Sequence, residues 1–453
     1  MVHRSTLREL SRLAFPMVVS QGAFAIMIFT DRLFMSYLDA THIAAALGGG
    51  VGSFFFLSFF TGLITYGNAL VAQYYGSGQT TKCARVTTQG LLISAASLPV
   101  LLVGAYYGGA AFSVMGHAGE QVALETVYFQ VLMTGSIFIL VKATFASYFA
   151  GIGQTRVVMV ADLLGTAINV PLTWALVFGN LGLPALGIAG AGLGTVMGTI
   201  FSILVFLAFY FSKLHRSRFN VARSWQFDAG IMRRYFRLGL PSGVESFMNT
   251  ATFNLFLLLF QSYGVVQGAA MAIVFNWDML SFIPMVGLNI AVMSMVGRCV
   301  GANDMQRAIE VIKAGFMLAL SYSGVLAMGF LIYREPLVAV FDNGGEDFSQ
   351  ILALGSQMMV GLVTYMLADA VILISGGALR GAGDTRWIML TSISVHWIML
   401  IVQYLVIVVY QLGPMVSWWV FVAMLLSLAV LYLWRLLGGK WAGAERLAKV
   451  MSE

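Results

Sequence analysis

Charged residues are scarce in this sequence. Asp, Glu, Lys and Arg make up 10% of its 453 residues, whereas about 25% is typical of soluble domains. Hydrophobic residues make up 59%, and the mean hydropathy is +0.87. This shortage of charge excludes an ordinary soluble globular protein and predicts a chain that lies in a lipid bilayer.

Cysteine is almost absent, with only Cys83 and Cys299. Both are expected near the cytoplasmic surface, where thiols stay reduced. So small a number excludes a disulfide framework, and no His/Cys spacing indicates a metal site. We therefore predict no metal, no cofactor and no catalytic residue. An integral membrane enzyme is a minor alternative, because the nucleophile or metal constellation that it needs near one surface is not found.

Long apolar runs, in contrast, fill the chain. A helix needs about 20 apolar residues to cross the hydrocarbon core of a bilayer. Twelve runs reach about that length, and the sequence therefore predicts an all-α integral membrane protein with twelve transmembrane helices. The runs lie at 13–37, 48–74, 89–112, 126–149, 158–179, 187–211, 239–262, 268–296, 312–333, 351–377, 388–410 and 415–437.

Basic residues indicate the orientation of these helices. Only Arg32, Lys142 and Arg334 of the 25 Lys and Arg residues lie away from the termini and the loops that join even to odd helices. Cytoplasmic loops carry the excess of Lys and Arg, so we expect both termini in the cytoplasm of a multi-pass protein of a bacterial-type inner membrane. The net charge of +6 is interpreted as a topology signal and as contact with lipid headgroups, and no nucleic-acid partner is expected.

The sequence repeats itself. RLAFP at 12–16 recurs as RLGLP at 237–241, an offset of 225, and GIGQTR at 151–156 recurs as GAGDTR at 381–386, an offset of 230. About five residues were therefore inserted in the second copy, and segment 333–350 is the expected place.

Each copy holds six helices. An even number gives both copies the same orientation, so we predict two six-helix lobes related by a pseudo-twofold axis along the membrane normal. The predicted parts are an N-lobe at 1–211, a cytoplasmic inter-lobe loop at 212–237 and a C-lobe at 238–453. Two such lobes favour a transporter that works by alternating access, although a channel or a scaffold can also be built from duplicated bundles.

Several charged side chains fall inside the predicted helices of the first copy, where an ionised group must be paired, solvated or neutral. Lys142 and Asp162 lie about ten residues on either side of a turn, which places them at similar depth on a helical hairpin. We interpret them as a structural pair. Asp31, about 18 residues past Arg12, has no such partner and is predicted to be functional.

The second copy contains a different set of polar groups. Asp369 and His396 lie about thirteen residues on either side of the 381–384 turn and are suited to proton transfer if they are level. His396 can also be a core histidine bonded to a backbone carbonyl. Glu245 and Asp278 have no basic residue in their own helices, so each is expected to hold a proton or to bind a cation. Supporting ligands or hydrogen-bond partners are expected from Asn249, Asn254, Asn276 and Tyr365.

These motifs together resemble the multidrug and toxic compound extrusion (MATE) family. The resemblance covers essentially the whole chain: the spacing from Pro16 to Asp31, GSGQ and GANDMQRA after helices two and eight, GIGQTR and ALRGAGDT after helices four and ten, and the N-x-P region of helix five. It implies antiport, in which a drug or toxic metabolite, often cationic, leaves while a proton or sodium ion enters.

The resemblance also implies a first-lobe cation site made of Asp31, Asn169 and Thr195. The family places an aspartate one turn after the asparagine, where this chain has Thr173. That difference removes one negative charge and leaves Asp31 able to protonate.

A second-lobe site is implied at Asp369, with Tyr365 one turn before it. The helix-seven acid of the family falls on Asn249, and Glu245, one turn earlier on the same face, is a candidate substitute. Asp278 resembles a helix-eight acid of some members. Pro16 and Pro171 are predicted bends that let helices one and five move.

The expected partners are small-molecule drugs or toxic metabolites and membrane lipid, the coupling ion is H+ or Na+, and the protein is expected to act as a monomer. The alternative within the same superfamily is a flippase of lipid-linked saccharides. Such a flippase favours a basic cavity for a pyrophosphate, whereas the unpaired central charges of this chain are acidic, with Lys142 and Arg32 as exceptions.

Overall fold

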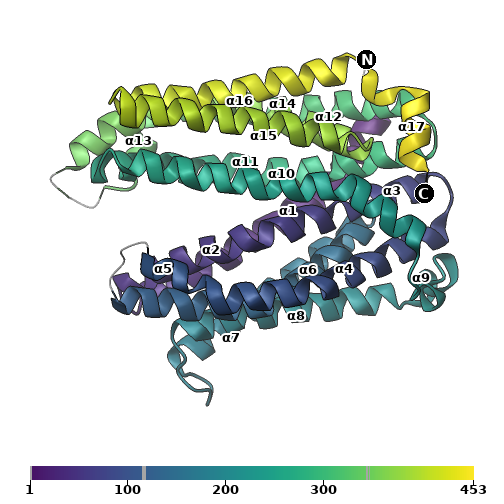
Figure 1. Ribbon diagram of the computed structural model, residues 1–453, viewed down its shortest axis with the longest axis horizontal. Helices are drawn as coiled ribbons and strands as arrows, with labels where there is room; N and C mark the ends of the chain where they lie inside the picture. Colours follow the sequence, from purple (N-terminus) through teal and green to yellow (C-terminus); the bar gives the residue numbers. More distant parts are fainter. Residues whose placement is uncertain (1–2, 115–118, 343–344, 346, 453) are drawn as a thin grey trace. The chain divides into compact units, whose positions relative to one another are not determined.

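The computed structural model describes residues 3–114, 119–342, 345 and 347–452. Helices dominate these residues, and no β-strand occurs among them (Figure 1). The elements are α1 (Arg4–Ser36), α2 (Ala40–Thr65), α3 (Gly67–Gly76), α4 (Thr80–Gly108), α5 (Ala110–Val114), α6 (Gly119–Gly151), α7 (Thr155–Phe178), α8 (Ile188–Tyr210), α9 (Lys213–Arg218), the 3-10 helix η1 (Val221–Arg223), α10 (Ala229–Gln261), α11 (Val265–Gly301), α12 (Met305–Ile332), α13 (Arg334–Ala339), α14 (Phe348–Gly381), α15 (Thr385–Tyr404), the π-helical turn η2 (Leu405–Val409), α16 (Pro414–Leu437), the 3-10 helix η3 (Lys440–Ala442) and α17 (Ala444–Met451).

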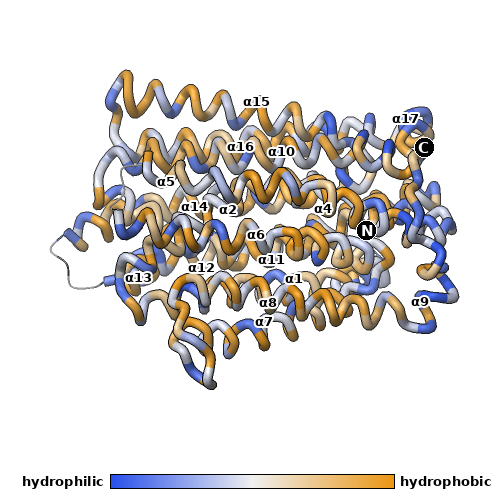
Figure 2. The backbone as a smooth tube through the Cα atoms, turned by 60° about the horizontal axis from the view of Figure 1, so that its bottom comes forward, coloured by the Kyte–Doolittle hydropathy of each residue, from blue (hydrophilic) through white to orange (hydrophobic). Residues whose placement is uncertain are grey.

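Eleven helical segments in the described part of the chain are long and apolar enough to cross a membrane. α10 adds a helix of 33 residues that lies outside this set of eleven and contains polar residues such as Glu245 and Asn249. The predicted all-α architecture with twelve long helices is thus confirmed. Figure 2 shows hydrophobic residues along these helices and hydrophilic ones gathered at their ends and in α9.

The two sequence copies fold into the same order of elements. α12 begins 225 residues after α4, at 305 against 80, and α14 begins 229 residues after α6, at 348 against 119. The inserted residues therefore lie between these landmarks, in the part of the second copy that contains α13. Residues 343, 344 and 346 of the expected segment 333–350 lie outside the described residues.

The segment expected as an inter-lobe loop, 212–237, is largely helical. It contains α9, η1 and the first nine residues of α10, which begins at Ala229 and not near residue 239. Asp228 explains the early start, because its carboxylate accepts a hydrogen bond from the backbone N–H of Ile231 at 3.1 Å. A side-chain acceptor of this kind satisfies one of the free N–H groups at a helix start.

The chain divides into two compact units. Unit 1 comprises Met1–Val18, Met248–Val300 and Asp304–Val450, and unit 2 comprises Val19–Phe247, Gly301–Asn303 and Met451–Glu453. α1 and α10 are divided between the two units, whereas α11 and α17 cross a boundary only by their last residues, Gly301 and Met451. α1 and α10 are counterparts in the sequence repeat, and each contains a proline, Pro16 or Pro241, a few residues before the boundary. Proline removes one helical hydrogen bond, so each boundary follows a weakened turn.

A stripe of small residues brings α8 against α7 within unit 2. Gly190, Gly194 and Gly198 are four residues apart and so lie on one face of α8. A Cβ atom at Gly198 would lie 2.7 Å from the Cβ of Asn169, and one at Gly190 would lie 2.6 Å from the carbonyl oxygen of Leu176. The helices approach this closely only because the glycines carry no side chain, a common device where lipid provides no hydrophobic force between helices.

Segment 212–237 belongs to unit 2, and His215 of α9 fixes its start. Its ring lies within hydrogen-bond distance of the Tyr148 hydroxyl, at 2.9 Å, and of the Gln154 side-chain oxygen, at 3.1 Å. The ring also stacks on Phe219, with centroids 5.2 Å apart. Burial, together with the nearby Arg218 guanidinium, lowers the pKa of His215. The neutral imidazole therefore holds α9 against α6 and the turn before α7.

The close approach of α7 and α8 generates a stability prediction. Gly198→Ala places a methyl group against Asn169 and is expected to lower the free energy of unfolding by about 1–3 kcal/mol, the usual cost of overpacking. Thermal or denaturant unfolding of the purified protein in detergent measures the change. Gly22→Ala in α1 is the matched control, because no atom lies within 4 Å of its added Cβ. Equal stability of the two variants would contradict the assigned packing.

Candidate functional site

One face of α7 is polar along most of its length. Asp162, Thr166, Asn169 and Thr173 follow at intervals of four, three and four residues, which places them on one side of the helix. The Thr166 hydroxyl donates to the Ala23 carbonyl of α1 at 3.2 Å. This row of side chains therefore forms a polar seam inside unit 2, with α1 as one of its partners.

At one part of the seam, the structure brings together the residues expected for a first-lobe site. The Thr195 hydroxyl of α8 donates to Asp31 Oδ2 at 2.5 Å. The Asn169 amide nitrogen donates to Thr173 Oγ1 at 3.2 Å and to Thr195 Oγ1 at 3.5 Å. The Thr195 hydroxyl thus links side chains of three helices, α1, α7 and α8, and Thr173 takes part as a neutral hydroxyl.

Two oxygen atoms of this cluster have no partner. Asp31 Oδ1 and Asn169 Oδ1 are both buried and accept no hydrogen bond from the described residues. Asp31 is only 5% exposed and Asn169 is fully buried. A buried polar atom left unsatisfied costs about 1–3 kcal/mol, and more when it is charged. A proton on Asp31, or a small hard cation coordinated by these oxygens, would remove that cost.

A second part of the seam contains an ion pair. Lys142 Nζ of α6 lies 2.8 Å from Asp162 Oδ1, and the hydroxyl of Ser20 in α1 donates to Asp162 Oδ2. Both oxygens of this carboxylate are therefore occupied. The pair ties α6 to α7, and Ser20 adds α1, so a structural role fits the geometry.

Unit 1 holds a second acidic cluster, on α11 and α14. The carboxyl groups of Asp278 and Asp369 interact electrostatically, and both interact with Tyr365. The Tyr365 hydroxyl is buried and lies near the Asp278 carboxyl, but off hydrogen-bond geometry. Its ring packs against Phe421, at 5.7 Å between centroids. Among the described residues neither aspartate forms an ion pair with a basic side chain.

The remaining second-copy residues of unit 1 form other hydrogen bonds. Asn249 of α10 donates to the Ser392 hydroxyl of α15 at 2.8 Å, and His396 Nδ1 lies 2.8 Å from the Ser392 carbonyl oxygen. His396 therefore uses a carbonyl of its own helix and shows no contact with Asp369 in the described part of the chain. The Asn276 amide donates to the Ala272 carbonyl at 2.9 Å within α11.

Glu245 and Asn254 complete the set of expected second-copy residues. Glu245 is buried, at 4% exposure, and belongs to unit 2, whereas Asp278 and Asp369 belong to unit 1. Asn254 donates to the Thr250 carbonyl within α10 at 2.8 Å. The side-chain amides of Asn254 and Asn276 thus donate to backbone carbonyl oxygens of their own helices.

Sequence reasoning missed Thr166 of the seam and three further polar residues. Ser20 and Ser392 complete networks around Asp162 and Asn249, but a lone serine in an apolar run gives no signal of its partner. Glu125 of α6 is fully buried and accepts a hydrogen bond from Gln121 at 2.9 Å. It was overlooked because the predicted run begins at residue 126, whereas the helix begins at Gly119.

The acidic side chains do not gather into a metal-binding group: no set of three or more His, Cys, Asp or Glu residues with suitable placement occurs among the described residues. The donors around Asp31 are one carboxylate, one amide and hydroxyls. Such oxygen donors suit a proton or a hard cation and not a soft transition metal.

Comparison with known proteins gives consistent results. The family model MatE matches residues 16–175 and 241–405. Among solved structures, a eukaryotic MATE transporter, AtDTX14, superposes with a TM-score of 0.85 at 16% identity, covering 98% of each chain. A MOP superfamily transporter from Pyrococcus furiosus gives 0.84 at 17% identity, covering 99% of this chain and 97% of that one. A multidrug resistance MATE family transporter in an outward-facing conformation gives 0.84 at 18% identity, with 98% and 96% covered.

The ion pair at Lys142 generates a prediction. Lys142→Met leaves the Asp162 carboxylate buried without its counter-ion and is expected to lower the free energy of unfolding by about 3–5 kcal/mol. The double variant Lys142→Met/Asp162→Leu removes both charges and should recover most of that loss. Denaturant unfolding in detergent compares the three proteins. A double variant as unstable as the single one would show that Lys142 stabilises through packing and not through charge.

Proposed function

The chain belongs to the MATE family of transporters, and from this premise we propose that it is a secondary antiporter that exports drugs or toxic metabolites. A proton or a sodium ion enters as the substrate leaves, through alternating access of the two lobes. The exported compounds are often cationic, and no catalytic step is involved. The protein works as a monomer in a bacterial-type inner membrane, with both termini in the cytoplasm.

The observation that carries this proposal is the pair of unsatisfied oxygens at Asp31 and Asn169. Unsatisfied buried polar atoms are costly in a transmembrane helix, so two oxygens left open in one cluster beside a carboxylate favour a bound proton or cation there. Thr195 donates to one oxygen of Asp31 and leaves the other open. A proton or cation at this point changes the charge of the cluster by one unit.

The acidic cluster of unit 1 supports the same proposal. Asp278 and Asp369 are two carboxyl groups within electrostatic reach of each other. Like charges this near in an apolar medium cannot both remain uncompensated, so the pair holds a proton or a cation. Coupling then requires that the ion binds the inward and outward states with different affinity.

The flippase alternative is weaker on one specific point. A lipid-linked pyrophosphate carries negative charge and needs free cationic side chains in the cavity that holds it. Lys142, the strongest candidate for such a residue, already contacts Asp162 at 2.8 Å. The charge of Lys142 is thereby neutralised within the seam.

A transport assay tests the coupling role of the two acidic sites. Purified protein in liposomes is expected to drive efflux of ethidium, an aromatic cation, when a pH or sodium gradient is imposed. Asp31→Asn and Asp369→Asn each remove a charge that the coupling ion needs, and each is expected to lower the gradient-driven rate about tenfold, within the usual range of coupling energies. Comparing the two gradients identifies the ion.

Glu120→Gln is the matched control, because Glu120 is an exposed carboxylate at the start of α6. This variant should transport at the wild-type rate. If both aspartate variants also retained the wild-type rate under either gradient, neither site would be a coupling site.

A further inference from the structure

A polar cavity lies where the segment before α10 crosses the start of α4. Its volume is about 280 Å³, and it is lined by Thr81, Arg85, Asn220, Arg223, Ser224 and Gln226. All six residues belong to unit 2. Pockets for drug-sized ligands usually exceed about 300 Å³ and are mostly apolar. The cavity is therefore suited to a small polar group, and it lies apart from the seam at Asp31.

The cavity carries positive charge that its surroundings only partly neutralise. Arg85 Nη1 forms one contact with Asp228 Oδ2, at 3.2 Å. Arg223 is exposed, and its guanidinium has no hydrogen bond or ion pair with the described residues. Two cations thus face the cavity with one carboxylate beside them. Guanidinium groups bind phosphate oxygens through paired N–H donors, so this lining favours an anionic phosphate.

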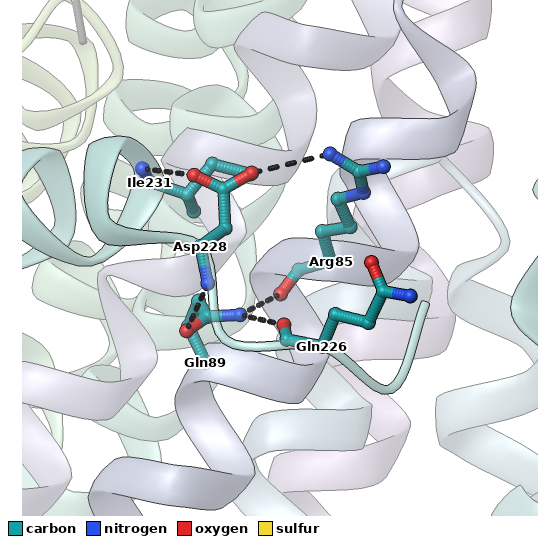
Figure 3. A network of polar contacts seen from close by, with 5 residues as sticks. All are labelled: Arg85, Gln89, Gln226, Asp228 and Ile231. Carbon is teal, nitrogen blue, oxygen red and sulfur yellow. Dashed lines mark hydrogen bonds and ion pairs between the residues drawn. The ribbon is translucent and has the colours of Figure 1, made fainter. Parts of the chain in front are cut away.

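Hydrogen bonds hold the wall of this cavity in place (Figure 3). Gln89 of α4 is fully buried. Its amide nitrogen donates to the carbonyl oxygens of Gln226, at 2.9 Å, and Arg85, at 3.3 Å, while its side-chain oxygen accepts from the backbone N–H of Asp228 at 3.3 Å. The segment is therefore clamped to α4, and the cavity is a preformed feature of unit 2.

Exposed aromatic side chains flank the cavity. Trp225 is 50% exposed and Phe227 is 67% exposed, and they alternate along the chain with the cavity residues Ser224 and Gln226. Trp225 also stacks on Phe211, just after the end of α8, with ring centroids 6.3 Å apart. Aromatic residues at the end of a transmembrane helix gather at the level of lipid headgroups. A basic cavity at that level lies within reach of the membrane surface.

From these observations we infer that the cavity binds the phosphate of an anionic phospholipid. Arg223 and the free edge of the Arg85 guanidinium contact the phosphate oxygens, Asn220 and Gln226 offer hydrogen bonds to the headgroup, and Trp225 and Phe227 lie against the acyl-chain boundary. Basic pockets beside transmembrane helices recognise headgroups through the same chemistry. A bound lipid would brace the start of α10 against α4, because Asp228 belongs to both the ion pair and the helix cap.

Lipid titration tests the inference. The purified protein in a neutral detergent is titrated with phosphatidylglycerol, phosphatidylcholine or inorganic phosphate, and its unfolding temperature is followed. Phosphatidylglycerol should raise that temperature in a saturable manner, and phosphatidylcholine should not. Arg223→Gln should raise the half-saturating concentration of phosphatidylglycerol about fivefold, which corresponds to about 1 kcal/mol for one arginine near an anionic lipid.

Arg156→Gln is the matched control, because Arg156 is an exposed arginine at the start of α7 and does not line the cavity. Its half-saturating concentration of phosphatidylglycerol should equal that of the wild-type protein. If both variants bound phosphatidylglycerol equally weakly, surface charge alone would attract the lipid, and the cavity would not be its binding site. If inorganic phosphate at the same concentration raised the unfolding temperature equally, the cavity would bind a soluble anion, and the proposal of a lipid ligand would be wrong.

Native mass spectrometry gives an independent measurement that does not depend on thermal stability. Wild-type protein should retain at least one more phosphatidylglycerol than Arg223→Gln at the same lipid concentration. Identical occupancy in the two proteins would overturn the inference, whatever the unfolding temperature of the variant.

Discussion

A polar atom inside a bilayer must find its partner within the protein, because hydrocarbon offers none. In unit 2 this constraint shapes the contacts that α7 makes. Asp162 is satisfied by Lys142 and Ser20, and Thr166 by the Ala23 carbonyl of α1. Most of the seam is thus complete without a ligand. The two open oxygens at Asp31 and Asn169 are conspicuous only against this background, and they locate the candidate site.

Close helix packing is what allows the candidate site to form. Thr195 of α8 can donate to Asp31 and accept from Asn169 only if α8 lies against α7 with little between them. Gly194 and Gly198 flank Thr195 on the packed face, and a side chain at either position would meet Thr173 or Asn169. The glycines therefore fix the distance between the hydroxyl and the amide. Site geometry and packing depend on the same few residues.

Helix number and depth are readable from the sequence, whereas rotation about a helix axis is not. The apolar runs predicted the twelve long helices, and the hairpin argument placed Lys142 and Asp162 at the same depth. The same argument allowed Asp369 and His396 to be level but left open a histidine bonded to a backbone carbonyl, and His396 does lie 2.8 Å from the Ser392 carbonyl oxygen of its own helix. The depth of a residue in the membrane can be predicted by counting residues from a turn. The direction in which its side chain points depends on how the helix packs against its neighbours. The early start of α10 was missed for a related reason, because an N-cap such as Asp228 does not stand out in a basic segment.

The two acidic clusters differ in a way that bears on coupling. Asp31 is one carboxylate among neutral hydroxyl and amide groups, so in the proposed function a single bound ion would change its charge. Asp278 and Asp369 share their electrostatic surroundings, so their occupation by protons or cations belongs to the pair and not to either residue. A single site gives a two-state response, whereas a coupled pair can hold one ion while it exchanges another. Duplication therefore supplied two similar helical scaffolds, and divergence of a few polar side chains gave them different sets of buried polar groups.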